Sequence, residues 1–152
     1  DYARHSTLVM ATIVLVEVFG YLWHRFAAHS ELLGVETTHD THHQASMAHQ
    51  ADEDFIWLMC LIVAFEVAMI HLLQMGRWTR ELGLITATVV LIFYWNWWLH
   101  ACFHDESHWL NNFSWFQRER ERHLVHHQEP DKNFSIASHF MDRWGGTWQA
   151  PA

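Results

Sequence analysis

Histidines at short, repeated spacings are the residues of this sequence with the clearest chemical potential. The chain of 152 residues contains 15 histidines, and most of them fall into four clusters. Two clusters have the spacing H-x-x-H-H, one has H-x4-H and one has H-x3-H. Neutral imidazole is a ligand for iron, copper, nickel and zinc. The clustered residues are His24, His29, His39, His42, His43, His100, His104, His123, His126 and His127.

Most of these spacings place imidazoles on one face of a helix. Positions i, i+3 and i+4 are neighbours on a helix surface, so each H-x-x-H-H motif is expected to aim three rings at one point, and H-x3-H two. The step from His24 to His29 is different, because five residues turn an α-helix by about 500° and leave the rings about 140° apart. This pair therefore requires an unwound helix end, or two metal ions on either side of the helix.

The size of the set predicts two metal ions. Zinc usually takes four ligands in proteins, so this many imidazoles exceed the needs of one ion. Two ions with four or five ligands each use the whole set, which favours a histidine-ligated di-iron centre in which zinc can substitute in a purified sample. The carboxylate type of di-iron bundle needs two Glu-x-x-His motifs, and the sequence has one, from Glu36 to His39. His108, four residues after His104, is left open as a replacement ligand.

The rest of the composition excludes several classes of protein. The net charge is −8 and no basic stripe is present, which argues against nucleic acid as a partner. The two cysteines, Cys60 and Cys102, form neither a disulfide framework nor a zinc pattern. The sequence has no Gly-rich phosphate loop, dinucleotide fingerprint or haem-attachment motif. We therefore expect no organic cofactor, and we expect electrons for redox chemistry to come from an external donor such as a ferredoxin.

Three long apolar runs must position these histidines. They cover residues 6–23, 55–75 and 82–99, contain no proline, and each has about the length that crosses a bilayer as a helix. We predict an all-α integral membrane protein with about three transmembrane helices and a cytoplasmic, helical, histidine-rich cap. Residues 1–152 are expected to form a single domain. A soluble bundle of fully buried helices is the alternative.

The order of the runs gathers the clustered histidines at one face of the membrane. Two crossings separate the second histidine motif from the third, so the chain returns to the side that it left. Positive residues are more frequent on the histidine side, which indicates that this side is cytoplasmic. On that side lie Arg25, Arg118, Arg120, Arg122, Lys132 and Arg143, and on the other Arg4, Arg77 and Arg80.

Two carboxylates lie within the predicted spans. Ionisable groups at membrane depth are costly and usually face a polar interior. Glu17 precedes His24 by seven residues, which is two helical turns on the same face. We predict that Glu17 supports a metal ligand or handles protons, and an interhelical hydrogen bond is the alternative. Glu66 has no such alignment and its role stays open.

The order H-x4-H, H-x-x-H-H, H-x3-H, H-x-x-H-H resembles the fatty-acid hydroxylase / sterol desaturase superfamily of integral-membrane di-iron oxygenases. The resemblance covers about residues 17–147. It implies that the clustered histidines hold two iron ions, that O2 is a co-substrate and that the substrate is a lipophilic small molecule taken from membrane lipid. The segment after the last histidine pair also resembles the superfamily's usual ending, with Ser135 in place of glycine. The matching residues there are Asn133, Phe134, Asp142, Arg143 and Thr147.

Within the superfamily the chain looks most like the bacterial carotenoid hydroxylases. The likeness rests on the glutamate seven residues before the first motif and on the segment DEDFIWL after the first histidine pair. The third motif is H-x3-H where those enzymes usually have H-x4-H, and the gap from His29 to His39 is longer. The likeness implies O2-dependent hydroxylation of an unactivated C–H bond on a carotenoid ring, as in a β-carotene 3-hydroxylase, in a bacterial inner membrane. A fatty-acyl or sterol hydroxylase or desaturase is the alternative.

Two functions of other classes also involve histidine-rich membrane chains. Loops of metal transporters rarely repeat H-x-x-H-H in register after successive spans, and release of bound metal without O2 consumption distinguishes that class. Doubled histidine pairs are poor axial ligands for a bis-histidine haem, and a missing Soret band dismisses that class.

Overall fold

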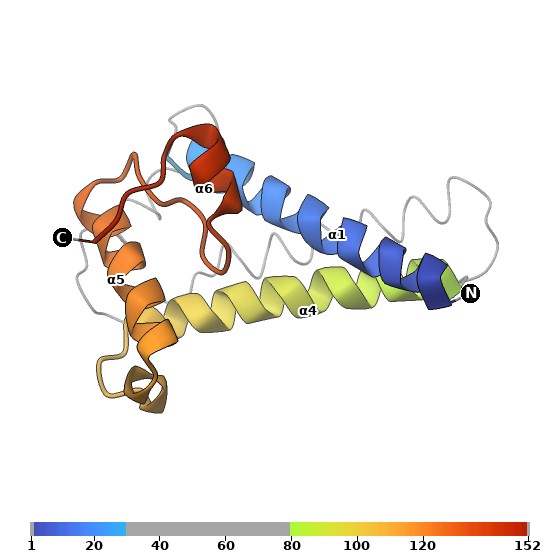
Figure 1. The fold of residues 1–152 in the computed structure, drawn as a ribbon, viewed down its shortest axis with the longest axis horizontal. Coiled ribbons are helices and arrows are strands. Elements are labelled where there is room, and N and C mark those ends of the chain that lie inside the picture. Colours follow the sequence, from blue (N-terminus) through green and yellow to red (C-terminus); the bar gives the residue numbers. More distant parts are fainter. Residues whose placement is uncertain (1, 30–79, 152) are drawn as a thin grey trace. The chain divides into compact units, whose positions relative to one another are not determined.

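The structure is a computed structural model that describes residues 2–29 and 80–151 (Figure 1). In chain order its elements are α1 (Tyr2–Trp23), the π-helical turn η1 (His24–Ala28), α4 (Arg80–Phe103), the 3-10 turn η3 (Trp109–Asn112), α5 (Ser114–Gln128) and α6 (Phe140–Gly145). This part of the chain contains no strand, so the all-α prediction is confirmed. The predicted span over residues 55–75 lies outside the described residues, as do Glu36, His39, His42, His43 and Glu66.

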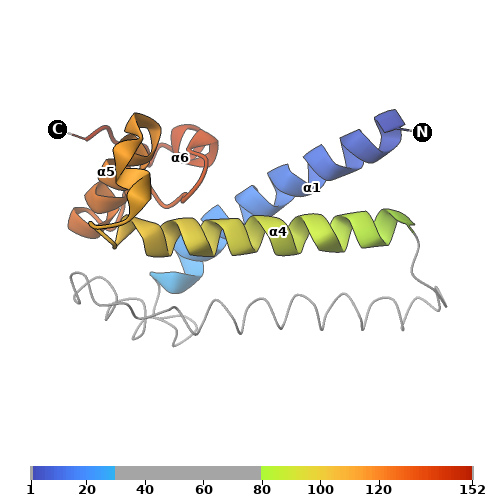
Figure 2. The same ribbon diagram turned by 90° about the horizontal axis from the view of Figure 1, so that it is seen from below.

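Two of the described helical segments are long and apolar enough to cross a bilayer. The first, Tyr2–Ala28, has 27 residues and the second, Arg80–Phe103, has 24. At 1.5 Å per residue the shorter segment is about 36 Å long, which exceeds the hydrocarbon core of about 30 Å. Figure 2 shows α1 and α4 as long, uninterrupted helices. Both begin before the apolar runs that predicted them, because no proline interrupts either end.

Three threonine hydroxyls within these helices are satisfied by the helix that carries them. Thr7, Thr12 and Thr88 each donate to the carbonyl four residues earlier, at 2.7–2.9 Å. Such a bond leaves no donor without a partner when the hydroxyl enters an apolar medium. These threonines are therefore compatible with a span in lipid.

The described residues belong to two compact units. The first contains residues 2–16 and 80–95, and the second contains residues 17–29 and 96–151. In the first unit Val16, Val89 and Phe93 form a small buried cluster. Val89 and Phe93 are four residues apart and so share one face of α4.

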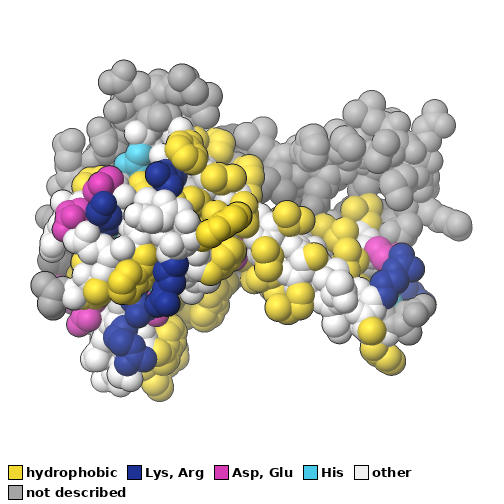
Figure 3. All heavy atoms as spheres, turned by 45° about the horizontal axis from the view of Figure 1, so that its top comes forward, with side chains coloured by type: hydrophobic (Ala, Val, Ile, Leu, Met, Phe, Trp, Pro, Cys, Tyr) yellow, Lys and Arg dark blue, Asp and Glu magenta, His cyan; other side chains and the backbone are white. Residues whose placement is uncertain are grey.

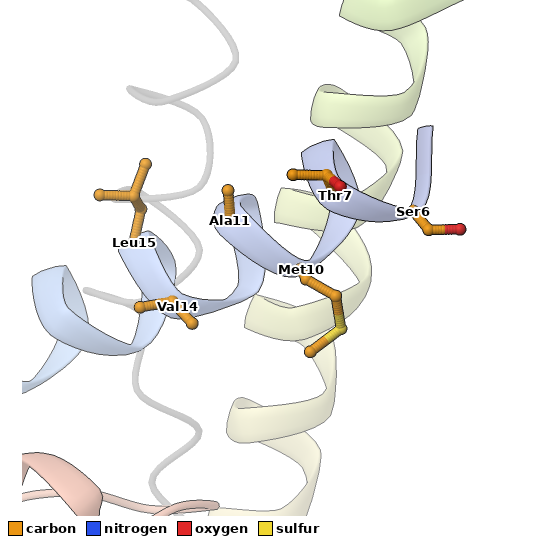
Figure 4. A pocket seen from close by; sticks show the side chains of 6 residues that line it. All are labelled: Ser6, Thr7, Met10, Ala11, Val14 and Leu15. Atoms are coloured by element: carbon orange, nitrogen blue, oxygen red, sulfur yellow. The ribbon is translucent and has the colours of Figure 1, made fainter. Parts of the chain in front are cut away.

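Apolar side chains also cover much of the surface of the first unit. Leu15 is 67% exposed and Leu91 is 65% exposed. Figure 4 shows a shallow groove along α1, and the side chains that line it are Ser6, Thr7, Met10, Ala11, Val14 and Leu15. An exposed apolar surface on helices of this length suits contact with lipid.

Two buried clusters form the core of the second unit. One consists of Leu99, Cys102, Phe103, Leu110 and Phe116. The other consists of Tyr21, Phe134 and Met141. Charged side chains gather over the part of the molecule that contains α5 and α6 (Figure 3). This unit contains all of the described histidines that the spacing selected.

Candidate metal centre

Four histidines from α4 and α5 form the larger of two histidine groups. His100 and His104 are four residues apart in α4, and His123 and His127 are four residues apart in α5. Each pair therefore occupies one helix face. The Nε2 atoms of His100 and His104 are 3.3 Å apart, those of His104 and His123 are 3.0 Å apart, and those of His123 and His127 are 3.0 Å apart. All four rings offer a ligand atom to one point.

These short contacts fit a shared cation better than a set of hydrogen bonds. The Nε2 atom of a neutral imidazole carries either one proton or one lone pair, so it makes one such bond. The Nε2 atoms of His104 and His123 each have two close histidine neighbours. A tetrahedral ion with bonds of 2.0–2.1 Å holds its ligand nitrogens about 3.3 Å apart. The spacing of this group fits that requirement.

The protonation of His123 also suits a metal ligand. Its side chain is buried, with 3% of the residue exposed. Burial, followed by the neighbouring imidazoles of His100, His127 and His104, holds the pKa of His123 well below its usual value. The ring is therefore neutral at physiological pH and retains a lone pair for a cation.

A side chain of α5 ties that helix to the end of α4. The Nε atom of Arg120 donates to the carbonyl of Phe103, the last residue of α4, at 2.8 Å. This bond satisfies a carbonyl that the helix leaves unpaired, and the positive charge suits the negative end of the helix dipole. The ring of Phe103 in turn stacks on His123, with 5.4 Å between ring centroids. The two helices that carry the four-histidine group are thus fixed at the site itself.

Three further histidines form a second group. His24 and His29 come from η1 and its C-terminal boundary, and His126 comes from α5. The Nε2 atoms of His29 and His126 are 3.3 Å apart, and the ring centroids of His24 and His126 are 4.6 Å apart. His126 is fully buried. This three-histidine group lies beside the first, because the ring centroids of His123 and His126 are 6.1 Å apart.

The π-helical turn explains how the H-x4-H motif works. A π-helix bonds residue i to residue i+5, so residues five apart lie one above the other. The rings of His24 and His29 accordingly stack with 5.1 Å between centroids. The sequence left open an unwound helix end or two metal ions on either side of the helix; in the structure a widened, π-helical turn brings the two rings together.

The last H-x-x-H-H motif does not aim three rings at one point, and that expectation was wrong. His123 and His127 enter the four-histidine group, whereas His126 enters the other group. Neighbouring residues on an α-helix are about 100° apart, so His126 and His127 diverge to either side of His123. One motif therefore supplies histidines to both groups. The equivalent expectation for His39, His42 and His43 lies outside the described residues.

Two backbone carbonyls fix the orientation of the three-histidine group. The Nδ1 atom of His24 donates to the carbonyl of Phe134 at 2.5 Å, and the Nδ1 atom of His126 donates to the carbonyl of Lys132 at 2.7 Å. A carbonyl only accepts, so the proton of each ring must be on Nδ1. The lone pair of each ring is then on Nε2, which in His126 is the atom that faces His29.

Glu17 lies in a hydrogen-bonded contact among three segments of the second unit. Its Oε1 atom accepts from Nδ2 of Asn96 in α4 at 3.3 Å, and its Oε2 atom accepts from the hydroxyl of Ser138 at 2.6 Å. These bonds correspond to the alternative that the sequence left open, an interhelical hydrogen bond. Support of a metal ligand or proton handling by Glu17 stays a prediction.

His108 has partners outside both histidine groups. Its Nε2 atom is 3.5 Å from the sulfur of Cys102, and its Nδ1 atom accepts from the backbone N–H of Leu110 at 3.4 Å. The side chain thereby caps η3. A structural role for His108 follows from these contacts.

A comparison with protein families agrees with this arrangement. The model of the family described as Fatty acid hydroxylase matches residues 9–147. The chain belongs to the fatty acid hydroxylase family. The resemblance that the histidine motifs indicated is thereby confirmed at the level of the superfamily. Comparisons with curated proteins and with solved structures found no match.

The ending that this hydroxylase shares with its superfamily contains functional residues that the histidine count missed. Asp142 is fully buried and accepts from the backbone N–H groups of Phe134 and Ser135 at 2.8 and 3.0 Å. The hydroxyl of Thr147 donates to Asp142 at 2.8 Å. The match to the superfamily's ending was the available signal for Asp142, whereas no signal selected its partner His139.

His139 lies between two carboxylates of this hydroxylase. Its Nε2 atom is 2.7 Å from Oε2 of Glu119, and its Nδ1 atom is 3.3 Å from Oδ2 of Asp142. Burial alone would lower the pKa of His139, but hydrogen bonds to Asp142 and Glu119 raise it above its usual value. Burial would raise the pKa of Glu119, but its bonds to His139 and Arg122 lower it. The two carboxylates therefore favour the protonated form of the His139 imidazole, and that imidazole favours their ionised forms.

Replacing His139 by glutamine is expected to lower thermal stability most at mildly acidic pH. A histidine whose pKa is raised on folding contributes fully below its unfolded pKa of about 6.5 and loses that contribution as the pH rises through the folded value. The carboxylates, whose pKa values are lowered, lose theirs as the pH falls below about 4. The melting temperatures of parent and variant should therefore differ most at about pH 5–6. An equal difference at about pH 8.5 would contradict the charged state assigned to His139.

Proposed function

We propose that this protein is a membrane non-haem di-iron monooxygenase that hydroxylates an unactivated C–H bond of a lipophilic substrate. The observation that carries the proposal is a pair of adjacent histidine groups, joined by α5, in a member of the fatty acid hydroxylase family. Their chemistry fits the metal, because clustered imidazole nitrogens suit iron and the spacing of ring nitrogens suits coordination. His39, His42 and His43 are proposed to complete the ligand set of His24, His29, His100, His104, His123, His126 and His127.

Two Fe(II) ions held in these groups would activate O2, the oxidant, so that one oxygen atom enters a C–H bond and the other leaves as water with two electrons and two protons from outside. The electrons are proposed to come from an external donor such as a ferredoxin. Within the chain, burial keeps His123 neutral and shields His126 from water. Zinc would occupy the same ligands in a sample purified without iron.

The position of the histidines suits a substrate dissolved in lipid. His24 follows directly after α1, and His100 and His104 lie at the end of α4. Since both helices have the length and composition of a membrane span, these ligands are proposed to lie near one membrane face. The excess of Lys and Arg on the histidine side supports the cytoplasmic face of a bacterial inner membrane.

A carotenoid ring is the proposed substrate, and fatty-acyl or sterol substrates are the alternative. The spacing from Glu17 to His24 and the segment DEDFIWL support the carotenoid. Glu17 would act there on the loop that it binds through Ser138, since the oxygen atoms of its carboxylate accept from Asn96 and Ser138.

Expression in cells that accumulate β-carotene is expected to yield ring-hydroxylated pigment, detected by chromatography and mass spectrometry. A matched culture carrying His126→Ala should yield none, because the variant lacks a proposed ligand of the three-histidine group. His126 also lies beside His123 of the four-histidine group, and the carbonyl of Lys132 accepts a hydrogen bond from its ring. Unchanged pigment with oxidised fatty-acyl or sterol lipids would transfer the proposal to those substrates. Purified protein that binds metal but neither consumes O2 nor oxidises any lipid class would contradict the proposed activity.

A further inference from the structure

Asp142 is a fully buried carboxylate that binds the backbone of the segment whose carbonyls accept from His24 and His126. We propose that Asp142 is a positioning residue for His24 and His126: it holds the segment 132–135, whose carbonyls fix those two rings for metal binding. The inference rests on the proposed function only in requiring that the three-histidine group binds a metal ion.

Asp142 holds the segment through hydrogen bonds to its backbone. Its two carboxylate oxygens accept from two successive backbone N–H groups, those of Phe134 and Ser135. Bonds from backbone N–H groups to an ionised carboxylate are among the stronger hydrogen bonds, and this carboxylate is fully buried. Its pKa is lowered by bonds to His139, Thr147 and Ser135, although burial acts in the opposite direction. The carboxylate is thus charged when it holds the segment.

These bonds stabilise a turn with a left-handed residue at Asn133. Asn133 lies between the two carbonyls that bind the histidines, and its φ is 50°, in the left-handed region. Asparagine tolerates this region better than most residues. Its side chain donates to the carbonyls of Arg122 and Gln149 at 3.2 and 2.9 Å and accepts from the N–H of Gln149 at 2.9 Å. The turn is therefore held by the Asn133 side chain and, immediately after it, by Asp142.

The position of this segment fixes the rings of His24 and His126. The carbonyls of Lys132 and Phe134 receive the Nδ1 protons of His126 and His24. A shift of the segment would release both rings together, since both acceptors belong to it. Groups that orient a metal-ligating histidine in this way usually contribute 10–100-fold to metal affinity. Among the described residues no hydrogen bond joins this segment to the four-histidine group, so the effect should be confined to one of the two metal positions.

The test is cobalt binding by the full chain, purified in detergent as the parent and as Asp142→Asn. Asparagine keeps the size of the side chain but presents an amide N–H₂ to one of the two backbone donors. We expect the variant to bind one Co(II) as the parent does and the second about 10–100-fold more weakly in competition with a chelator. The visible absorption of Co(II), which reports ligand number, should lose the bands of the weakened position only.

Leu110→Ala is the matched control, because Leu110 is buried in the other core cluster of the same unit. It should lower the melting temperature without changing either Co(II) affinity. The inference is overturned if Asp142→Asn binds both ions like the parent, or if it weakens both equally. It is also overturned if Leu110→Ala weakens the same position by the same factor. A parent chain that binds no cobalt would instead overturn the proposed function, and this inference with it.

Discussion

Replacing His123 by alanine is expected to abolish hydroxylation and to remove the metal ion of the four-histidine group. The Nε2 atom of His123 lies 3.0 Å from those of both His104 and His127, so it is the central donor of that group. Its loss leaves three of the described histidines in that group and a space among them. Total metal per chain, measured by mass spectrometry, should fall by about one ion, because the variant lacks one of the side chains proposed to bind that ion directly.

His108→Ala is the control for this variant. His108 lies in the same unit and is partly buried, but its ring caps η3 and contacts Cys102. The control should keep its metal content and its activity. If His123→Ala retained full activity with its metal, the assignment of the four-histidine group would be wrong.

Phe103→Ala is expected to cause a large loss of stability in the second unit. Phe103 is fully buried and lies 5.3 Å from Phe116 and 5.4 Å from His123, measured between ring centroids. Removal of a buried phenylalanine side chain typically lowers the free energy of unfolding by about 3–5 kcal/mol. Denaturant unfolding in detergent, followed by tryptophan fluorescence, measures the change.

The matched control is Phe113→Ala, because Phe113 is 44% exposed in the same unit. Its free energy of unfolding should change by about 1 kcal/mol or less, because the ring contacts the exposed Trp109 and is not part of a buried cluster. Equal losses in the two variants would show that Phe103 is not a core residue.

Helix content, and which of the described histidines belong to the two groups taken together, were predictable from local pattern. Apolar runs without proline predicted α1 and α4, and short histidine spacings selected the residues that form both groups. Both signals depend only on helix geometry, in which residues three or four apart share a face.

The pairing between motifs was not predictable in this way. His126 joins His24 and His29, while its neighbour His127 joins His100 and His104. That division depends on the rotation of α5 about its own axis, which Arg120 and the packing of Phe103 fix through contacts distant in sequence. The role of Asp142 was hidden for the same reason, since it acts through backbone atoms eight and seven residues away.

The π-helical turn at His24–Ala28 shows that histidine pairs of different spacing can have the same ring separation. In α4 the rings of His100 and His104 lie 5.0 Å apart across three intervening residues, and in η1 those of His24 and His29 lie 5.1 Å apart across four. A single inserted residue is thus absorbed by a wider turn, and the two rings keep their separation. H-x3-H and H-x4-H therefore reach the same ring separation by different helical turns, with the ring planes 81° apart in the first pair and 23° apart in the second.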